Sequence, residues 1–225
     1  MFDQIFKFVS DAKVLNTHSH HYPNDFFVDF NLDKLLRDSY IAWCDVEFGD
    51  TPESRNNYLN KVKFKSYFVY LQAALKKLYQ IDEDLTADNW EQYSQAIALA
   101  HKDSEWHKTI LSKHCNYEKN ILDAYWDPGS NNGEPDVFAS TFRIDSLFFG
   151  FDKDAFNHNG HNAYEFYQNE SSDIDEYMAF VRNLIVRKMK NGCISLKNTM
   201  TAWRNAFHSH GHIRAAGAYG KCIHG

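Results

Sequence analysis

The chain has 225 residues, of which 44% are hydrophobic and 16% aromatic, a supply of core-forming side chains that excludes an intrinsically disordered protein. Thirty acidic residues against 24 basic ones give a formal net charge of −6, so the chain lacks the positive footprint expected for binding nucleic acid or an anionic membrane. Four widely spaced cysteines, no visible secretory signal and no apolar run of the roughly 18 residues that span a membrane predict a cytoplasmic protein.

Helical spacing of apolar residues dominates the first half of the chain, where it predicts helices at residues 2–11, 32–43, 52–79, 86–100 and 104–111. A short buried strand beginning at Lys13 and stopped by Pro23 precedes most of them. In the second half, β-prone segments predict strands at residues 120–123, 137–144 and 193–197, with a helix at 172–189 before the last strand.

Strands that alternate with helices favour βα units and a parallel sheet, whose functional sites lie at the carboxyl ends of the strands. The helical block at about residues 32–115 then reads as a large insertion after the first strand. The predicted fold class is therefore α/β.

The first strand ends in a motif with two histidines, His18 and His20. Alternate residues of a strand point to the same face, so the two imidazoles can share one divalent metal ion. The same spacing recurs at His208, His210 and His212, so spacing alone does not separate a metal site from ordinary polar residues at a strand end. The apolar strand before the first copy and Pro23 after it favour His18 and His20 as ligands.

Several segments follow one another in an order that is similar to a known family. They are Leu15–His20, Leu78-Tyr79, Leu85–Trp90, Phe142–Asp145 and Gly192–Lys197. Over about residues 10–205, this order resembles the amidohydrolase superfamily of metal-dependent TIM barrels, in the branch near the uronate isomerases and the "amidohydrolase 2" hydrolases.

The resemblance implies that residues 1–205 are the N-terminal part of a (β/α)8 TIM barrel and that the chain is a metal-dependent hydrolase acting on a small, carboxylate-bearing molecule. It implies His18 and His20 as ligands of a divalent ion, with zinc expected, Arg143 as a substrate-binding residue and Lys197 as an active-site or metal-bridging lysine. From the residues alone, Arg143 is as well explained by an ion pair with Asp145, and Lys197 by a solvent-reaching lysine. Isomerisation of a uronate is the alternative reaction, because the histidine pair serves either chemistry.

The end of the chain departs from this family. A whole barrel has eight strand–helix units and typically about 250 residues, whereas four strands are predicted here, followed by a His- and Gly-rich tail at 206–225. Either the chain is an inactive truncated fragment lacking the C-terminal half of the barrel, or His208, His210 and His212 supply a substitute metal site. An open half-sheet would favour a homo-oligomer.

A carbohydrate-binding module is a third hypothesis. It would use exposed tryptophans, drawn from Trp43, Trp90, Trp106, Trp126 and Trp203.

Overall fold

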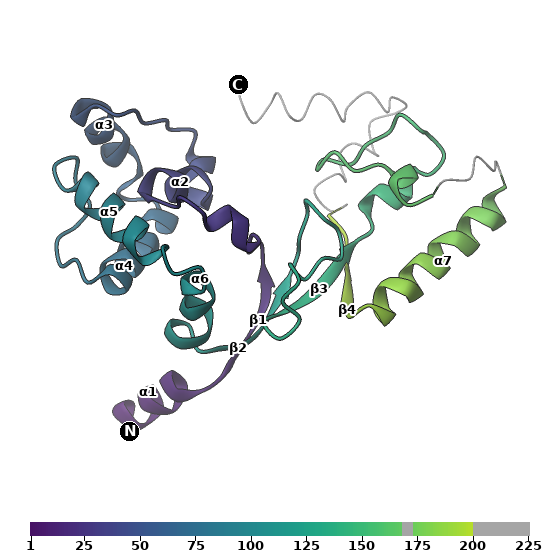
Figure 1. The fold of residues 1–225 in the computed structure, drawn as a ribbon, viewed down its shortest axis with the longest axis horizontal. Helices are drawn as coiled ribbons and strands as arrows, with labels where there is room; N and C mark the ends of the chain where they lie inside the picture. Colours follow the sequence, from purple (N-terminus) through teal and green to yellow (C-terminus); the bar gives the residue numbers. More distant parts are fainter. Residues whose placement is uncertain (168–172, 200–225) are drawn as a thin grey trace. The chain divides into compact units, whose positions relative to one another are not determined.

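The computed structural model describes residues 1–167 and 173–199, which fall into two compact units (Figure 1). One unit joins residues 1–22 to the chain from Tyr117 onward, and the other is the continuous stretch Pro23–Asn116. Among the described helices, none has both the length and the apolar character that crossing a membrane requires.

The first unit is built on a four-stranded parallel sheet with the strand order β1-β2-β3-β4. The strands are β1 (Val14–Ser19), β2 (Tyr117–Leu122), β3 (Phe138–Arg143) and β4 (Cys193–Lys197). Ser19 lies opposite Leu122, and Arg143 lies opposite Lys197, so the carboxyl ends of the strands share one edge of the sheet. The predicted α/β class with a parallel sheet is confirmed, and β4 has the predicted bounds.

Helix α7 (Ile174–Lys190) supplies the core of this sheet. Its Leu184 is buried against Phe142 of β3 and Cys193 of β4. The sequence places the start of this helix at Ser172, which lies outside the described residues; the observed N-cap is Asp173. After the helix, Gly192 takes a φ of +98°, a left-handed conformation that suits glycine and turns the chain directly into β4.

Helix α1 (Phe2–Asp11) begins the same unit, and its predicted bounds are confirmed. None of its ten residues is buried. Its apolar residues at positions 2, 5, 6 and 9 are each more than half exposed.

The second unit is helical. Its elements are α2 (Leu32–Arg37), a 3-10 turn at Tyr40–Cys44, α3 (Pro52–Val62), α4 (Ser66–Tyr79), α5 (Trp90–Ala100) and α6 (Trp106–Thr109). One aromatic and aliphatic core around Tyr58, Trp90 and Tyr93 joins α2, the 3-10 turn, α3, α4 and α5. The Trp90 indole is fully buried and donates to Asp33 at 2.7 Å, so this tryptophan is no exposed sugar platform.

The single helix predicted at residues 52–79 is wrong, because Lys65 is extended (φ −75°, ψ 133°) and separates α3 from α4. Val62 and Phe68 are both buried in the same core. Six residues apart on one helix, they would point about 120° away from each other. The break lets both side chains reach that core. The predicted helix at 32–43 is likewise interrupted, since α2 ends at Arg37.

Candidate metal centre

His18 and His20 lie together at the carboxyl end of β1. Their Nε2 atoms are 3.1 Å apart, and the two rings meet edge to face with centroids 4.6 Å apart. The expectation that the two imidazoles share one face is confirmed.

The geometry of this pair fits a shared cation. Zinc–nitrogen bonds of about 2.05 Å to both Nε2 atoms would span 3.1 Å at an N–Zn–N angle of about 98°, close to tetrahedral. His20 Nδ1 lies 2.7 Å from the backbone carbonyl of Asp123, which can only accept, so Nδ1 carries the proton and the Nε2 lone pair is left for a ligand. Two nitrogen lone pairs at this distance repel unless a proton or a cation lies between them.

A third group completes the cluster. Asp123 follows β2 directly, and its side chain is 1% exposed. One carboxylate oxygen and one ring nitrogen from each histidine all lie within 4.8 Å of one another. The Asp123 amide donates to the Ser19 carbonyl at 2.8 Å, which ties the two strand ends together. Asp123 was not predicted as a ligand from the sequence, although it lies at the end of a predicted strand, as His18 and His20 do.

Arg143, at the end of β3, holds Asp123 with both prongs of its guanidinium. Nε donates to Oδ1 at 2.9 Å, and Nη2 donates to Oδ2 at 2.8 Å. The remaining nitrogen, Nη1, donates to Asn159 Oδ1 at 2.6 Å and lies 3.2 Å from His158 Nε2. Arg143 is 6% exposed, so its fork faces Asp123 and the loop rather than open solvent.

These contacts give Arg143 a partner other than the Asp145 considered from the sequence. Asp145 Oδ1 accepts instead from the backbone of Thr199 at 2.7 Å. Binding of substrate by Arg143 stays a prediction.

The protonation of the cluster follows from its surroundings. Burial alone raises the pKa of the Asp123 carboxyl, but hydrogen bonds and positive charge from Arg143, with smaller contributions from His20 and Lys197, bring that pKa below its ordinary value. Burial, followed by the charges of Lys197 and His20, lowers the pKa of His18 below 6.5. A carboxylate and neutral imidazoles are the forms that bind metal.

Lys197 lies at the carboxyl end of β4, with Nζ 3.9 Å from Asp123 Oδ2 and 32% of its side chain exposed. All four residues singled out from the sequence therefore gather around Asp123. Counting Asp123, Arg143 and Lys197, the cluster carries a net charge of +1 before any ion binds. This charge favours an anionic ligand beside the cation.

Aromatic residues line the approach on one side. The Tyr125 ring meets His20 edge to face at 5.5 Å, and its hydroxyl lies 2.6 Å from that of Tyr22. Tyr22 in turn stacks on Trp126 at 4.5 Å. The Arg143 guanidinium carbon lies 6.0 Å from the centre of the Tyr125 ring, so aromatic and cationic groups adjoin at the cluster.

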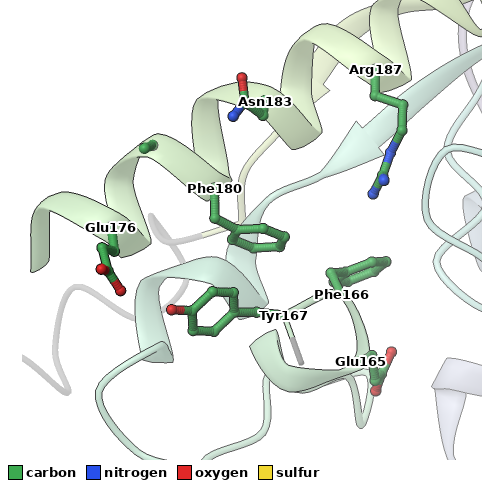
Figure 2. Close-up of a pocket in the computed structure, with 8 residues that line it drawn as sticks. Glu165, Phe166, Tyr167, Glu176, Phe180, Asn183 and Arg187 are labelled. Atoms are coloured by element: carbon green, nitrogen blue, oxygen red, sulfur yellow. The ribbon is translucent and has the colours of Figure 1, made fainter. Parts of the chain in front are cut away.

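A pocket of about 810 Å³ lies elsewhere in the same unit, between α7 and residues 165–167 (Figure 2). Phe166, Tyr167 and Phe180 line it together with charged residues of α7. It contains none of the residues of the histidine cluster, so its size does not make it the reactive site. The side chains that could hold a metal ion lie in the cluster and not in this pocket.

His208, His210, His212 and Trp203 lie outside the described residues. In comparisons with known proteins, no protein-family model and no curated protein matches the chain.

Proposed function

We propose that the chain is a metal-dependent hydrolase in which His18, His20 and Asp123 hold a divalent ion, with zinc expected. The observation that carries the proposal is the 3.1 Å approach of the two Nε2 atoms beside a buried carboxylate. Bound there, such an ion would activate water or polarise a substrate oxygen near neutral pH. Two histidines and one carboxylate form a donor set typical of catalytic zinc sites.

The surrounding residues support a substrate that carries a carboxylate. Lys197 reaches the cluster with part of its side chain in solvent, so its ammonium can attract and orient an anion. Arg143 holds Asp123 in place through two parallel hydrogen bonds. The Tyr125 ring lies against both His20 and Arg143, which places an aromatic surface beside the cluster.

The sheet topology supports a barrel of the amidohydrolase type. Four parallel strands adjoin one another in chain order, as in a (β/α)8 barrel, whereas a doubly wound sheet reverses its strand order at a switch point. We extend the proposal to a cytoplasmic location, on the basis of four separated cysteines without a Cys-x-x-Cys motif. Uronate isomerisation is the alternative reaction, since the same residues would hold a hydroxy-carbonyl substrate.

The test measures metal binding by the purified, metal-stripped chain. Binding is followed by calorimetric titration with Zn²⁺, and the bound metal is counted by elemental analysis. The wild type is expected to hold one ion per chain, and His18→Ala/His20→Ala is expected to lose it. A variant with alanine at 208, 210 and 212 is the matched control, because it removes three histidines and leaves the cluster intact. If the His18/His20 double variant still binds one ion per chain and the control variant binds none, the metal site lies in the tail and the proposal is wrong.

Turnover then separates the reactions. Zinc-loaded wild type is assayed with carboxylate-bearing amides and esters for hydrolysis, and with uronates for conversion of aldose to ketose. A chain that binds zinc through the cluster and catalyses neither reaction counts against both proposed activities.

A further inference from the structure

Helix α1 carries an exposed apolar face that lies outside the metal centre. Phe2 and Phe6 are 77% and 63% exposed. With ring surfaces of roughly 150–250 Å² each, these two side chains leave on the order of 300 Å² of apolar surface uncovered. Ile5 and Val9 extend the same face and are also more than half exposed.

A helix of this kind needs a partner to be stable. Ten residues are too few for a stable isolated helix in water, where most helical stability comes from packing of an apolar face. No residue of α1 is buried within the described part of the chain. The exposed face is roughly half of the about 800 Å² that one partner contributes to a standard interface, which is the scale of a weak dimer contact.

The charges of α1 argue against a membrane as that partner. Asp3 and Asp11 outnumber Lys7, so the helix carries a net charge of −1. Helices that lie on anionic membranes are instead rich in lysine and arginine. Lys7 pairs with Asp11 at 2.8 Å, and at 100° per residue both lie on the side of the helix opposite the apolar face.

The spacing of the apolar row matches a second copy of the same helix. Phe2, Ile5, Phe6 and Val9 fall within about 100° of one another around the helix axis. Their intervals of three, one and three residues read the same from either end. Two copies placed antiparallel about a twofold axis therefore bring Phe2 against Val9 of the second copy, and Ile5 against Phe6.

We propose that α1 is a dimerisation helix, which pairs with α1 of a second copy of this chain in an antiparallel arrangement. Phe2, Ile5, Phe6 and Val9 form the contact. This inference is independent of the proposed hydrolase activity.

The first experiment measures the molecular mass of the full chain by sedimentation equilibrium over a dilution series. Phe6→Asp is expected to weaken dimerisation by at least tenfold, and Gln4→Asp is the matched control, since it adds the same charge on the polar side of the same helix. A wild type that stays monomeric throughout, or a Phe6→Asp chain that dimerises like the wild type, overturns the proposal.

The second experiment tests the pairing. Phe2→Asp and Val9→Lys chains are each expected to be monomeric, whereas their mixture is expected to form a heterodimer, because the antiparallel register places the new acid opposite the new base. No gain on mixing overturns the antiparallel arrangement.

Two further measurements expose other occupants of the face. If Phe6→Asp lowers the unfolding midpoint of a monomeric chain, the face is covered within one chain. If the wild type, and not Phe6→Asp, co-sediments with phosphatidylcholine vesicles, the occupant is a bilayer. Either result overturns the proposal.

Discussion

The guanidinium of Arg143 is joined to the carboxylate of Asp123 by two hydrogen bonds, at 2.9 and 2.8 Å, and both side chains are almost completely buried. Arg143, at the end of β3, thereby holds the candidate metal ligand Asp123, at the end of the neighbouring strand β2, in place. It also keeps that carboxylate charged, because Arg143 lowers the pKa of Asp123 against the effect of burial.

Removing the arginine is therefore expected to destabilise the protein. Arg143→Met leaves the Asp123 charge buried, and the free energy of unfolding, measured by urea denaturation, is expected to fall by about 3–5 kcal/mol. Arg143→Met/Asp123→Asn is expected to recover part of this loss because no charge remains unpaired. Arg187→Met removes an arginine of α7 whose side chain is exposed and is the control; an equal effect there would show that Arg143 has no special role.

Lys197 places a positive charge beside the cluster, and this charge opposes a bound cation. Lys197→Gln is expected to tighten zinc binding several-fold at low salt, with the gain shrinking as salt screens the charge. Titration calorimetry at two ionic strengths measures both effects, with Lys190→Gln as the control. Weaker binding in Lys197→Gln would mean that the lysine supports the metal directly, as the family resemblance implies.

His101 makes the helical unit sensitive to acid. Its ring stacks on Phe27 with centroids 5.7 Å apart, and burial, with a smaller effect of His107, lowers its pKa to about 4. The unfolded chain, with a histidine pKa near 6.5, binds the proton more tightly, so stability is full above pH 6.5 and falls as the pH drops toward 4.

Urea denaturation between pH 7.5 and 4 checks this dependence. The contribution of His101 to the slope is expected to stay below the limit of about 1.4 kcal/mol per pH unit, because the folded and unfolded states differ by less than one bound proton at this site. His101→Gln is expected to flatten the pH dependence of the helical unit, whereas His114→Gln retains it. If the stability of His101→Gln falls with pH as steeply as that of the wild type, His101 is not the cause of the acid sensitivity.

Packing of α7 on the sheet gives a prediction about stability. Leu184 is 2% exposed and touches the core beside Phe142, so Leu184→Ala is expected to cost about 2–5 kcal/mol of unfolding free energy. Val186, two residues further along, is 49% exposed, and Val186→Ala is expected to change stability by less than about 0.5 kcal/mol. Thermal and urea denaturation of both variants tests the orientation of the helix.

Local signals in the sequence predicted β4 and α1. The apolar residues of α1 recur at helical spacing, and Gly192 marks the start of β4. The break at Lys65 had no such signal. No glycine or proline stands there, and only the shared core of Val62 and Phe68 requires it.

In the metal centre, too, the residues with a local sequence signal were predicted and those that depend on the tertiary structure were not. A local motif with a strand before it and a proline after it led to His18 and His20. Asp123 comes from a strand more than 100 residues later, and its proximity to His20 depends on which strands adjoin. The sequence pattern predicts a strand that ends at Asp123, but not which strands adjoin. It therefore could not show that Asp123 meets His20 and Arg143.

The order of the two units along the chain has a consequence for synthesis on the ribosome. Asn16 of β1 bonds to Asn120 of β2, 104 residues later, and the whole helical unit is translated in between. At a synthesis rate of roughly 5–20 residues per second, about 5–20 seconds pass between the synthesis of β1 and that of its partner strand β2. The helices between them can fold during this time. A translational pause before Tyr117 is therefore expected to prolong the exposure of β1 and to leave the helical unit unharmed.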